Sequence, residues 1–172
     1  MALILKTIPR GVDIPINSLQ NLLYTELDLL SYESYPRVYK NPDVNGLTMP
    51  ESYVGNKDYK EVFFDDKFSL TSFWLADDNR SVSEFTTTTI SVVFQVLLDE
   101  LYPTIPHRAD EEFIRDIYNI LYNSPRDYDL TNVITGIDNV YSEFDTSQVT
   151  WDDMSNFFVC RFDLEAVYDY NC

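Results

Sequence analysis

Carboxylates are the side chains of this sequence whose number and spacing could do chemistry. Adjacent acids occur at Asp65-Asp66, Asp77-Asp78, Asp99-Glu100, Asp110 to Glu112 and Asp152-Asp153. Neighbouring side chains of a strand point to opposite faces, so these pairs do not form a two-carboxylate site by spacing alone. A calcium loop needs acids at alternating positions around a central glycine, and no segment has that pattern. We therefore expect solvated turns and a helix start, and no metal site.

The single histidine, His107, limits the catalytic chemistry that one chain can perform. One histidine cannot supply a zinc cluster or a two-histidine site. No nucleophile-elbow motif accompanies it, so we expect His107 to pack or hydrogen-bond at the entry of a helix and not to serve in a Ser-His-Asp group. Only four glycines occur, and none belongs to a Walker or dinucleotide fingerprint. The sequence predicts no catalytic, metal or cofactor-binding residue, and an enzyme is the least favoured class.

The charge balance is strongly acidic. The 172 residues include 12 basic and 29 acidic side chains, which gives a net charge of −17. Such a field repels nucleic-acid phosphates and anionic membrane surfaces. It favours solubility, a positively charged partner, or a surface past which DNA moves without being held. With 45% hydrophobic and 15% aromatic residues, the chain can bury the core of one ordinary domain.

The two cysteines and the apolar start of the chain bear on its compartment. Cys160 falls on the apolar face of an expected strand, where a buried, inert thiol is favoured over a redox or ligand role. Two cysteines are too few to indicate a fold held together by disulfide bonds. The first apolar run is too short for a signal peptide or a membrane span. We expect a protein that folds in a cytosol, with residues 1–12 as an N-terminal arm and residues 13–172 as a single domain.

A long strand followed by a helix is the expected spine of the fold. Apolar residues alternate along one strand face at Ile90, Val92, Phe94, Val96 and Leu98. The opposite face is mixed and carries Thr89, Ser91, Val93, Gln95 and Leu97. We expect the mixed face to be only partly covered and to be the first place to look for what the protein touches.

Helical spacing predicts two helices. One covers residues 15–29, with Pro15 in its first turn. The other follows Pro106, because apolar residues recur at Phe113, Ile117 and Leu121 behind three acids that suit the positive end of the helix dipole.

The remaining segments complete an α+β pattern. We expect a short strand over residues 35–40, a loop over 41–56, and a hairpin of residues 61–64 with 68–75 that turns at Asp65-Asp66. Residues 132–144 and 158–168 are expected to close the sheet, with Arg161, Asp163 and Glu165 facing water or a partner. The predicted fold is a mixed, mainly antiparallel sheet flanked by two helices.

Surface aromatic and apolar residues indicate possible contact regions. The thirteen tyrosines fit either the rim of a monomer core or a wet protein interface. Trp151 is either a lid over the edge of the core or an exposed interface anchor.

Four segments of this sequence carry a resemblance to a known family. The order of elements, ending in ITGIDNVYSEF and FFVCRFDLEAVY, resembles the tail terminator (tail completion) and neck ring proteins of tailed bacteriophages. SVVFQVLLDELYP followed by HRADEEFIRDIYNIL is similar to small virion proteins from phages of Bacteroidetes hosts. The resemblance spans residues 13–170. It implies a virion protein without enzymatic activity or cofactor, which forms a six-fold or twelve-fold ring beside portal, neck or tail proteins and leaves a channel for DNA.

This resemblance suggests roles for particular residues. We expect Leu3, Ile4 and Leu5 of the arm and the loop between Asp43 and Lys57 to contact neighbouring subunits or rings. We expect the acid pairs Asp65-Asp66 and Asp77-Asp78 to face the lumen, where they would repel DNA. The alternative from another class is an acidic DNA mimic that inhibits a basic host factor. The net charge suits such a mimic, whereas the scatter of the acids through turns and strand faces does not.

Overall fold

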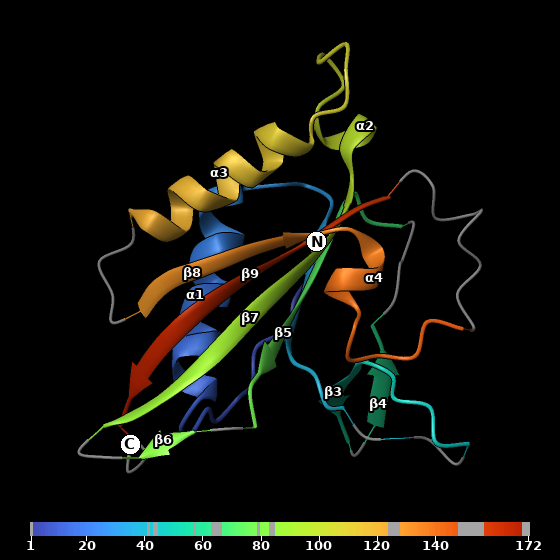
Figure 1. Cartoon of the computed structure of the whole chain (residues 1–172). Helices are drawn as coiled ribbons and strands as arrows, with labels where there is room; N and C mark the ends of the chain where they lie inside the picture. The colour runs from blue at the N-terminus through green and yellow to red at the C-terminus, as the bar shows by residue number, and fades with distance from the viewer. Residues whose placement is uncertain are drawn as a thin grey trace.

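The computed structural model has an α+β fold, with a mixed, mainly antiparallel sheet and helices packed against it (Figure 1). It describes residues 2–40, 42, 45–56, 58–62, 67–78, 80–82, 85–123, 128–147 and 157–169. The fold class predicted from the sequence is therefore confirmed. Beside the two long helices that were expected, two helices of four residues are present, α2 (Leu98–Leu101) and α4 (Ile137–Val140).

The main sheet follows the order β1-β2-β5-β7-β9-β8, and β6 pairs with one end of β7. Its strands are β1 (Ala2–Leu3), β2 (Tyr32–Arg37), β5 (Leu70–Ala76), β6 (Ser81–Val82), β7 (Thr86–Leu97), β8 (Tyr128–Thr135) and β9 (Phe157–Tyr168). The β1–β2 and β2–β5 pairs are parallel, and the other pairs are antiparallel. The long strands β7 and β9 pair over their full lengths, so they form the backbone of the domain.

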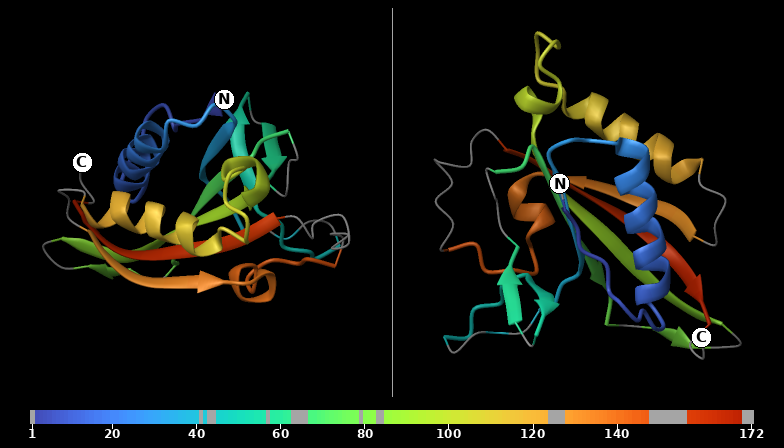
Figure 2. Two further views of the ribbon diagram at one scale, coloured as in Figure 1. Left: turned by 90° about the horizontal axis from the view of Figure 1, so that it is seen from above. Right: turned by 180° about the vertical axis from the view of Figure 1, so that it is seen from behind.

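Helices α1 (Asp13–Leu27) and α3 (Asp110–Tyr122) lie over the same face of the sheet (Figure 2, left). Both form near the predicted positions, because their apolar residues recur at helical spacing. Leu19 and Leu23 of α1 and Phe113 of α3 are fully buried against the predicted apolar face of β7. α1 ends where Asp28 takes a left-handed conformation with φ of 43°.

The opposite face of β7 is covered more completely than the sequence indicated. Val93 and Gln95 are fully buried and Ser91 is 8% exposed, whereas Thr89 remains exposed. The cover comes largely from α4 and the turn after it, where Tyr141 and its neighbours form a second apolar cluster. The expectation that this face is only partly covered and available for contacts is wrong for its central part, since local segments of the same chain fold over it.

The same cover acts on the outward face of β9. Asp163 is 9% exposed and the side chain of Arg161 is 14% exposed. The expectation that these two side chains face water is therefore wrong. Glu165 lies beyond the cover and is exposed. The structure thus leaves only the end of this strand face open to solvent.

The predicted hairpin between residues 61–64 and 68–75 is wrong. β4 (Asp58–Glu61) pairs with β3 (Glu51–Gly55) in a separate two-stranded sheet, so residues 41–56 are not all loop. β5 instead lies between β2 and β7. The physical reason is that β5 buries apolar side chains on both faces, which suits an interior strand and not one arm of an isolated hairpin.

The predicted strand over residues 132–144 also needs correction. β8 begins earlier, at Tyr128, and ends at Thr135. Gly136 follows with φ of 87°, a conformation that favours glycine, and the chain then turns into α4. The expected strand over 35–40 likewise begins earlier, at Tyr32, and ends at Arg37.

Candidate functional site

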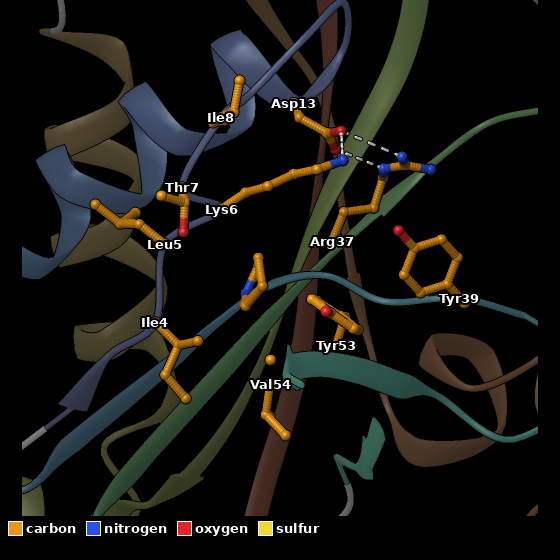
Figure 3. A pocket seen from close by; sticks show the side chains of 12 residues that line it. Ile4, Leu5, Lys6, Thr7, Ile8, Asp13, Arg37, Tyr39, Tyr53 and Val54 are labelled. Atoms are coloured by element: carbon orange, nitrogen blue, oxygen red, sulfur yellow. Dashed lines mark hydrogen bonds and ion pairs between the residues drawn. The ribbon is translucent and has the colours of Figure 1, made fainter. Parts of the chain in front are cut away.

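A groove lies between the N-terminal segment and β3 (Figure 3). We call it the arm groove. Residues 4–8 line one side and residues 53–55 the other, together with Asp13, Pro36, Arg37 and Tyr39. The cavity measures about 360 Å³, a size that admits a large side chain or a short segment of a partner.

Three elements position the arm groove. β1 adds to the parallel edge of β2, and the backbone N–H of Ile4 donates to the carbonyl oxygen of Ser34 at 2.9 Å. The β3–β4 hairpin is attached to the segment that follows β2 by two backbone hydrogen bonds. The N–H of Tyr39 donates to the carbonyl oxygen of Glu51, and the N–H of Glu51 donates to the carbonyl oxygen of Tyr39. The N-terminal segment and the hairpin are therefore held on two sides of the β2 strand end, which leaves the hollow between them.

An ion-pair cluster lies at one end of the groove. Asp13, the first residue of α1, is 3% exposed and accepts from Arg37 Nε at 2.7 Å and from Lys6 Nζ. Burial by itself would raise the pKa of the Asp13 carboxyl, but the hydrogen bonds from Arg37 and Lys6 outweigh burial and hold this pKa below its usual value. The positive end of α1 acts in the same direction. Two cations face one carboxylate, so the cluster carries a net positive charge in an acidic protein.

Apolar and aromatic side chains form the rest of the groove. Leu5 and Ile8 are 39% and 70% exposed, and Tyr53 and Val54 are 42% and 40% exposed. The Tyr53 ring packs edge to face on the ring of Tyr59, with centroids 5.3 Å apart. Such a combination of exposed apolar surface and a few fixed charges is typical of a protein contact site.

The arm groove unites two regions that the sequence singled out separately. Ile4 and Leu5 of the predicted arm line it, and Leu3 lies beside it in β1. Residues 53–55 come from the loop expected between Asp43 and Lys57. Asp43, Lys57 and Trp151 themselves lie outside the described residues. The sequence could not show that the two regions meet, because their contact depends on the position of β2.

A second hollow, of about 460 Å³, lies where β8 and β9 meet the start of β7. Its lining defines what we call the acidic face: Phe85, Tyr128, Asp129, Glu165, Val167, Tyr168 and Asp169. Asp129 stands directly opposite Glu165 across the β8–β9 pair, and both are exposed. No local sequence pattern indicates this surface, because strand register alone brings the two acids together.

The expected lumen acids can be placed only in part. Asp77 and Asp78 are exposed at the end of β5, and the Asp77 backbone N–H donates to the carbonyl oxygen of Thr89 at 2.9 Å. Asp65 and Asp66 lie outside the described residues. Asp77 and Asp78 are therefore available to solvent, and their place beside a channel stays a prediction.

The residues considered for catalysis do not converge. The side chain of His107 is 66% exposed, with Nε2 at 3.5 Å from Glu112 Oε1. Within the described ranges, no group of three His, Cys, Asp or Glu side chains could hold a metal ion. Cys160 is fully buried, and burial strongly raises the pKa of its thiol, which disfavours the reactive thiolate.

A buried polar network on β7 and β9 escaped the sequence analysis. Ser91 Oγ donates to Asp163 Oδ1 at 2.6 Å, and Arg161 Nε lies 2.8 Å from the same oxygen. Arg161 Nη1 also lies 3.7 Å from Oε1 of Glu143, which follows α4 in the chain. The network ties the sheet to the segment that covers it, so its role is structural. The only sequence signal was the alternation of charged residues along β9.

Comparisons with known proteins give no relative from which a role could be transferred. No family model matches this chain, and no curated protein matches it. In the part of the chain that the structure describes, no helix is long and apolar enough to cross a membrane.

Proposed function

We propose that this protein is a non-enzymatic structural subunit that forms a ring with copies of itself in the neck or tail of a tailed bacteriophage. In this role it is a tail terminator or head-tail connector component around the DNA channel, in contact with adjacent portal, neck or tail proteins. The resemblance of its sequence to such proteins supports the proposal. The α+β architecture, with its mixed sheet and packed helices, is compatible with it.

The observation that carries the proposal is a pair of unlike surfaces on one small domain. The arm groove lies at the β1–β2 end of the sheet, and the acidic face lies at the β8–β9 end. They share no residue and differ in charge. A subunit with two different contact surfaces associates head to tail, and such contacts generate a closed ring when the rotation between subunits closes.

The charge of the chain supports a channel role. A net charge of −17 on each subunit repels the phosphates of passing DNA, and a ring multiplies that charge around its axis. Exposed acids such as Asp77 and Asp78 would contribute where they face the lumen. DNA would then pass without specific binding.

Light scattering and negative-stain electron microscopy of the purified chain test the proposal. We expect particles whose mass is an integral multiple of 20.1 kDa and whose images show closed rings with a central hole. Six-fold or twelve-fold symmetry is expected. A chain that stays monomeric at all accessible concentrations, or that assembles only into open filaments, would contradict it.

An acidic inhibitor that mimics DNA is the second candidate, favoured by the net charge alone. Such a protein would be a monomer or dimer that binds a basic DNA-binding protein and is displaced by duplex DNA. The same light-scattering measurement separates the two functions, since a mimic needs no ring. A competition experiment with labelled DNA then identifies the mimic directly.

A further inference from the structure

We infer that the arm groove of one copy binds the acidic face of the next copy. In this contact, Phe85 and Val167 enter the groove between the N-terminal segment and β3. Asp129 and Glu165 face Lys6 at the charged end. The inference rests on the proposed function, because it names the contact that would join neighbouring subunits of the ring.

Charge complementarity identifies the occupant as a second copy. Of the described residues that line the arm groove, the charged ones are Lys6, Arg37 and the single carboxylate Asp13. Among the described residues, the lining of the acidic face carries three carboxylates and no cation. In a chain with 12 basic and 29 acidic residues, a groove with more cations than acids is the exception. The two surfaces therefore attract each other, whereas most other pairings of two such chains repel.

The apolar parts of the two surfaces also match. Phe85 is 52% exposed and Val167 is 39% exposed at the acidic face, beside the carboxylates. In the groove, Leu5, Ile8 and Val54 are each at least 39% exposed and surround a cavity of about 360 Å³. An aromatic side chain inserted into an apolar pocket and rimmed by charges is the usual anatomy of a strong contact.

The register of β8 and β9 gives a further reason for a cationic partner. Asp129 and Glu165 are directly opposite each other, and like charges in that position destabilise a strand pair. A cation brought to both carboxylates would remove this repulsion. Lys6 is suited to the role, since its side chain is 40% exposed although its Nζ contacts Asp13.

Cross-linking between two singly substituted chains tests the contact directly. Val54→Cys and Val167→Cys are matched probes, 40% and 39% exposed, in a Cys172→Ser background. Cys160 is buried and will not interfere. We expect a short bismaleimide to join the chains when the two variants are mixed, and to give little dimer with either variant alone. Cross-linking of Val54→Cys to itself, or none in the mixture, would overturn the inference.

Charge reversal tests the electrostatic part. Glu165→Lys and Lys6→Glu should each weaken self-association at least about tenfold, and the chain with both substitutions should regain most of it. Phe85→Ala should weaken association by a similar factor.

Asp138→Lys is the matched control for Glu165→Lys, because it makes the same change of net charge at an exposed site outside both surfaces. Sedimentation velocity measures association, and thermal unfolding shows that each variant is folded. No effect of Glu165→Lys and Phe85→Ala would overturn the inference.

The outcomes separate this inference from the ring proposal. If the wild-type chain forms rings but positions 54 and 167 do not cross-link, the inferred contact is wrong and the ring stands. If the cross-link forms but micrographs show only dimers or filaments, the contact stands and the ring is wrong. A monomer without cross-links overturns both.

Discussion

The two faces of the central strands β7 and β9 are both largely dry, but they are built from different chemistry. The face under α1 and α3 is apolar over its central part, as Phe94 and Phe162 illustrate, and Thr86 and Thr88 are buried at one end of it. The face under α4 buries Ser91, Gln95 and Asp163 among valines. The first face depends on close packing, whereas the second also depends on each buried polar group keeping its partner. The second face is therefore the more specific of the two and the more vulnerable to the loss of one atom.

Truncation of one buried phenylalanine on each face measures this difference. Phe94 packs edge to face on Phe113 of α3 and on Phe162, and Phe73 packs on Tyr141 and Phe144 across the other face. We expect Phe94→Ala to lower the free energy of unfolding by about 4 kcal/mol, within the range known for such truncations. Phe73→Ala should cost less, because the short α4 segment can relax into the cavity more easily than a long helix. Urea unfolding of both variants gives the two values.

The difference between the costs of Phe94→Ala and Phe73→Ala reports how firmly each cover is held. Both residues are fully buried phenylalanines, so the transfer term is the same and only the response of the cover differs. A cost for Phe73→Ala equal to or above that for Phe94→Ala would mean that α4 is held as firmly as α3.

The packed helix face is also the part of the fold that the sequence predicted best. Its residues recur at period two in β7 and β9 and at helical spacing in α1 and α3, so local pattern and burial agree. The other face was misjudged because polar residues such as Gln95 are buried through tertiary pairing, here with the Tyr141 hydroxyl, 46 residues away, and with the carbonyl oxygen of Val62. β5 was misassigned as a hairpin arm although its continuous apolar run is typical of an interior strand.

The largest electrostatic effect is expected at Asp13, beside the helix face. Its pKa is lowered in the folded chain, so its contribution to stability is fully present above its unfolded value of 3.8 and is lost as pH falls through the lower, folded value. Asp13→Asn should lower the free energy of unfolding by about 2 kcal/mol at neutral pH, from weakened bonds to Arg37 and Lys6. The difference from wild type should narrow below pH 3.8.

Urea unfolding between neutral and acidic pH measures the Asp13 effect. Asp138→Asn is the control, because Asp138 is exposed and lies away from the cluster. A difference between wild type and Asp13→Asn that does not change with pH would show that the ion-pair cluster adds no pH-dependent stability.

The polar pairing under α4 is tested by a double-mutant cycle on Gln95 and Tyr141. Gln95 Nε2 donates to the Tyr141 hydroxyl oxygen at 2.8 Å, and both side chains are buried. Gln95→Leu should cost about 1.5 kcal/mol, because it removes the donor and leaves the hydroxyl in place. The double variant Gln95→Leu/Tyr141→Phe should lose less free energy of unfolding than the sum of the two single variants, because both polar groups are then removed together. Additive costs would mean that this face, like the helix face, depends on packing alone.

The candidate site was predictable only in fragments. The sequence indicated the arm residues Ile4 and Leu5 and the loop that contains Tyr53, but not that they border one groove. It gave no sign of the acidic face, since Asp129 and Glu165 are far apart in sequence and meet through strand register. Surfaces assembled from distant segments depend on topology, and no local pattern encodes them.

The smallest expected effect on stability occurs at Glu165, at the open end of the α4 face, where the buried network stops. Glu165→Lys places a cation opposite Asp129, so it should raise the free energy of unfolding by about 0.5 kcal/mol. The same substitution should weaken self-association, as inferred above. A charge that lowers the stability of the monomer but strengthens association serves a partner, whereas Asp163 on the same strand face has its partners within the chain. If Glu165→Lys instead destabilises the monomer and leaves association intact, the open end of this face is ordinary scaffold, like the part under α4.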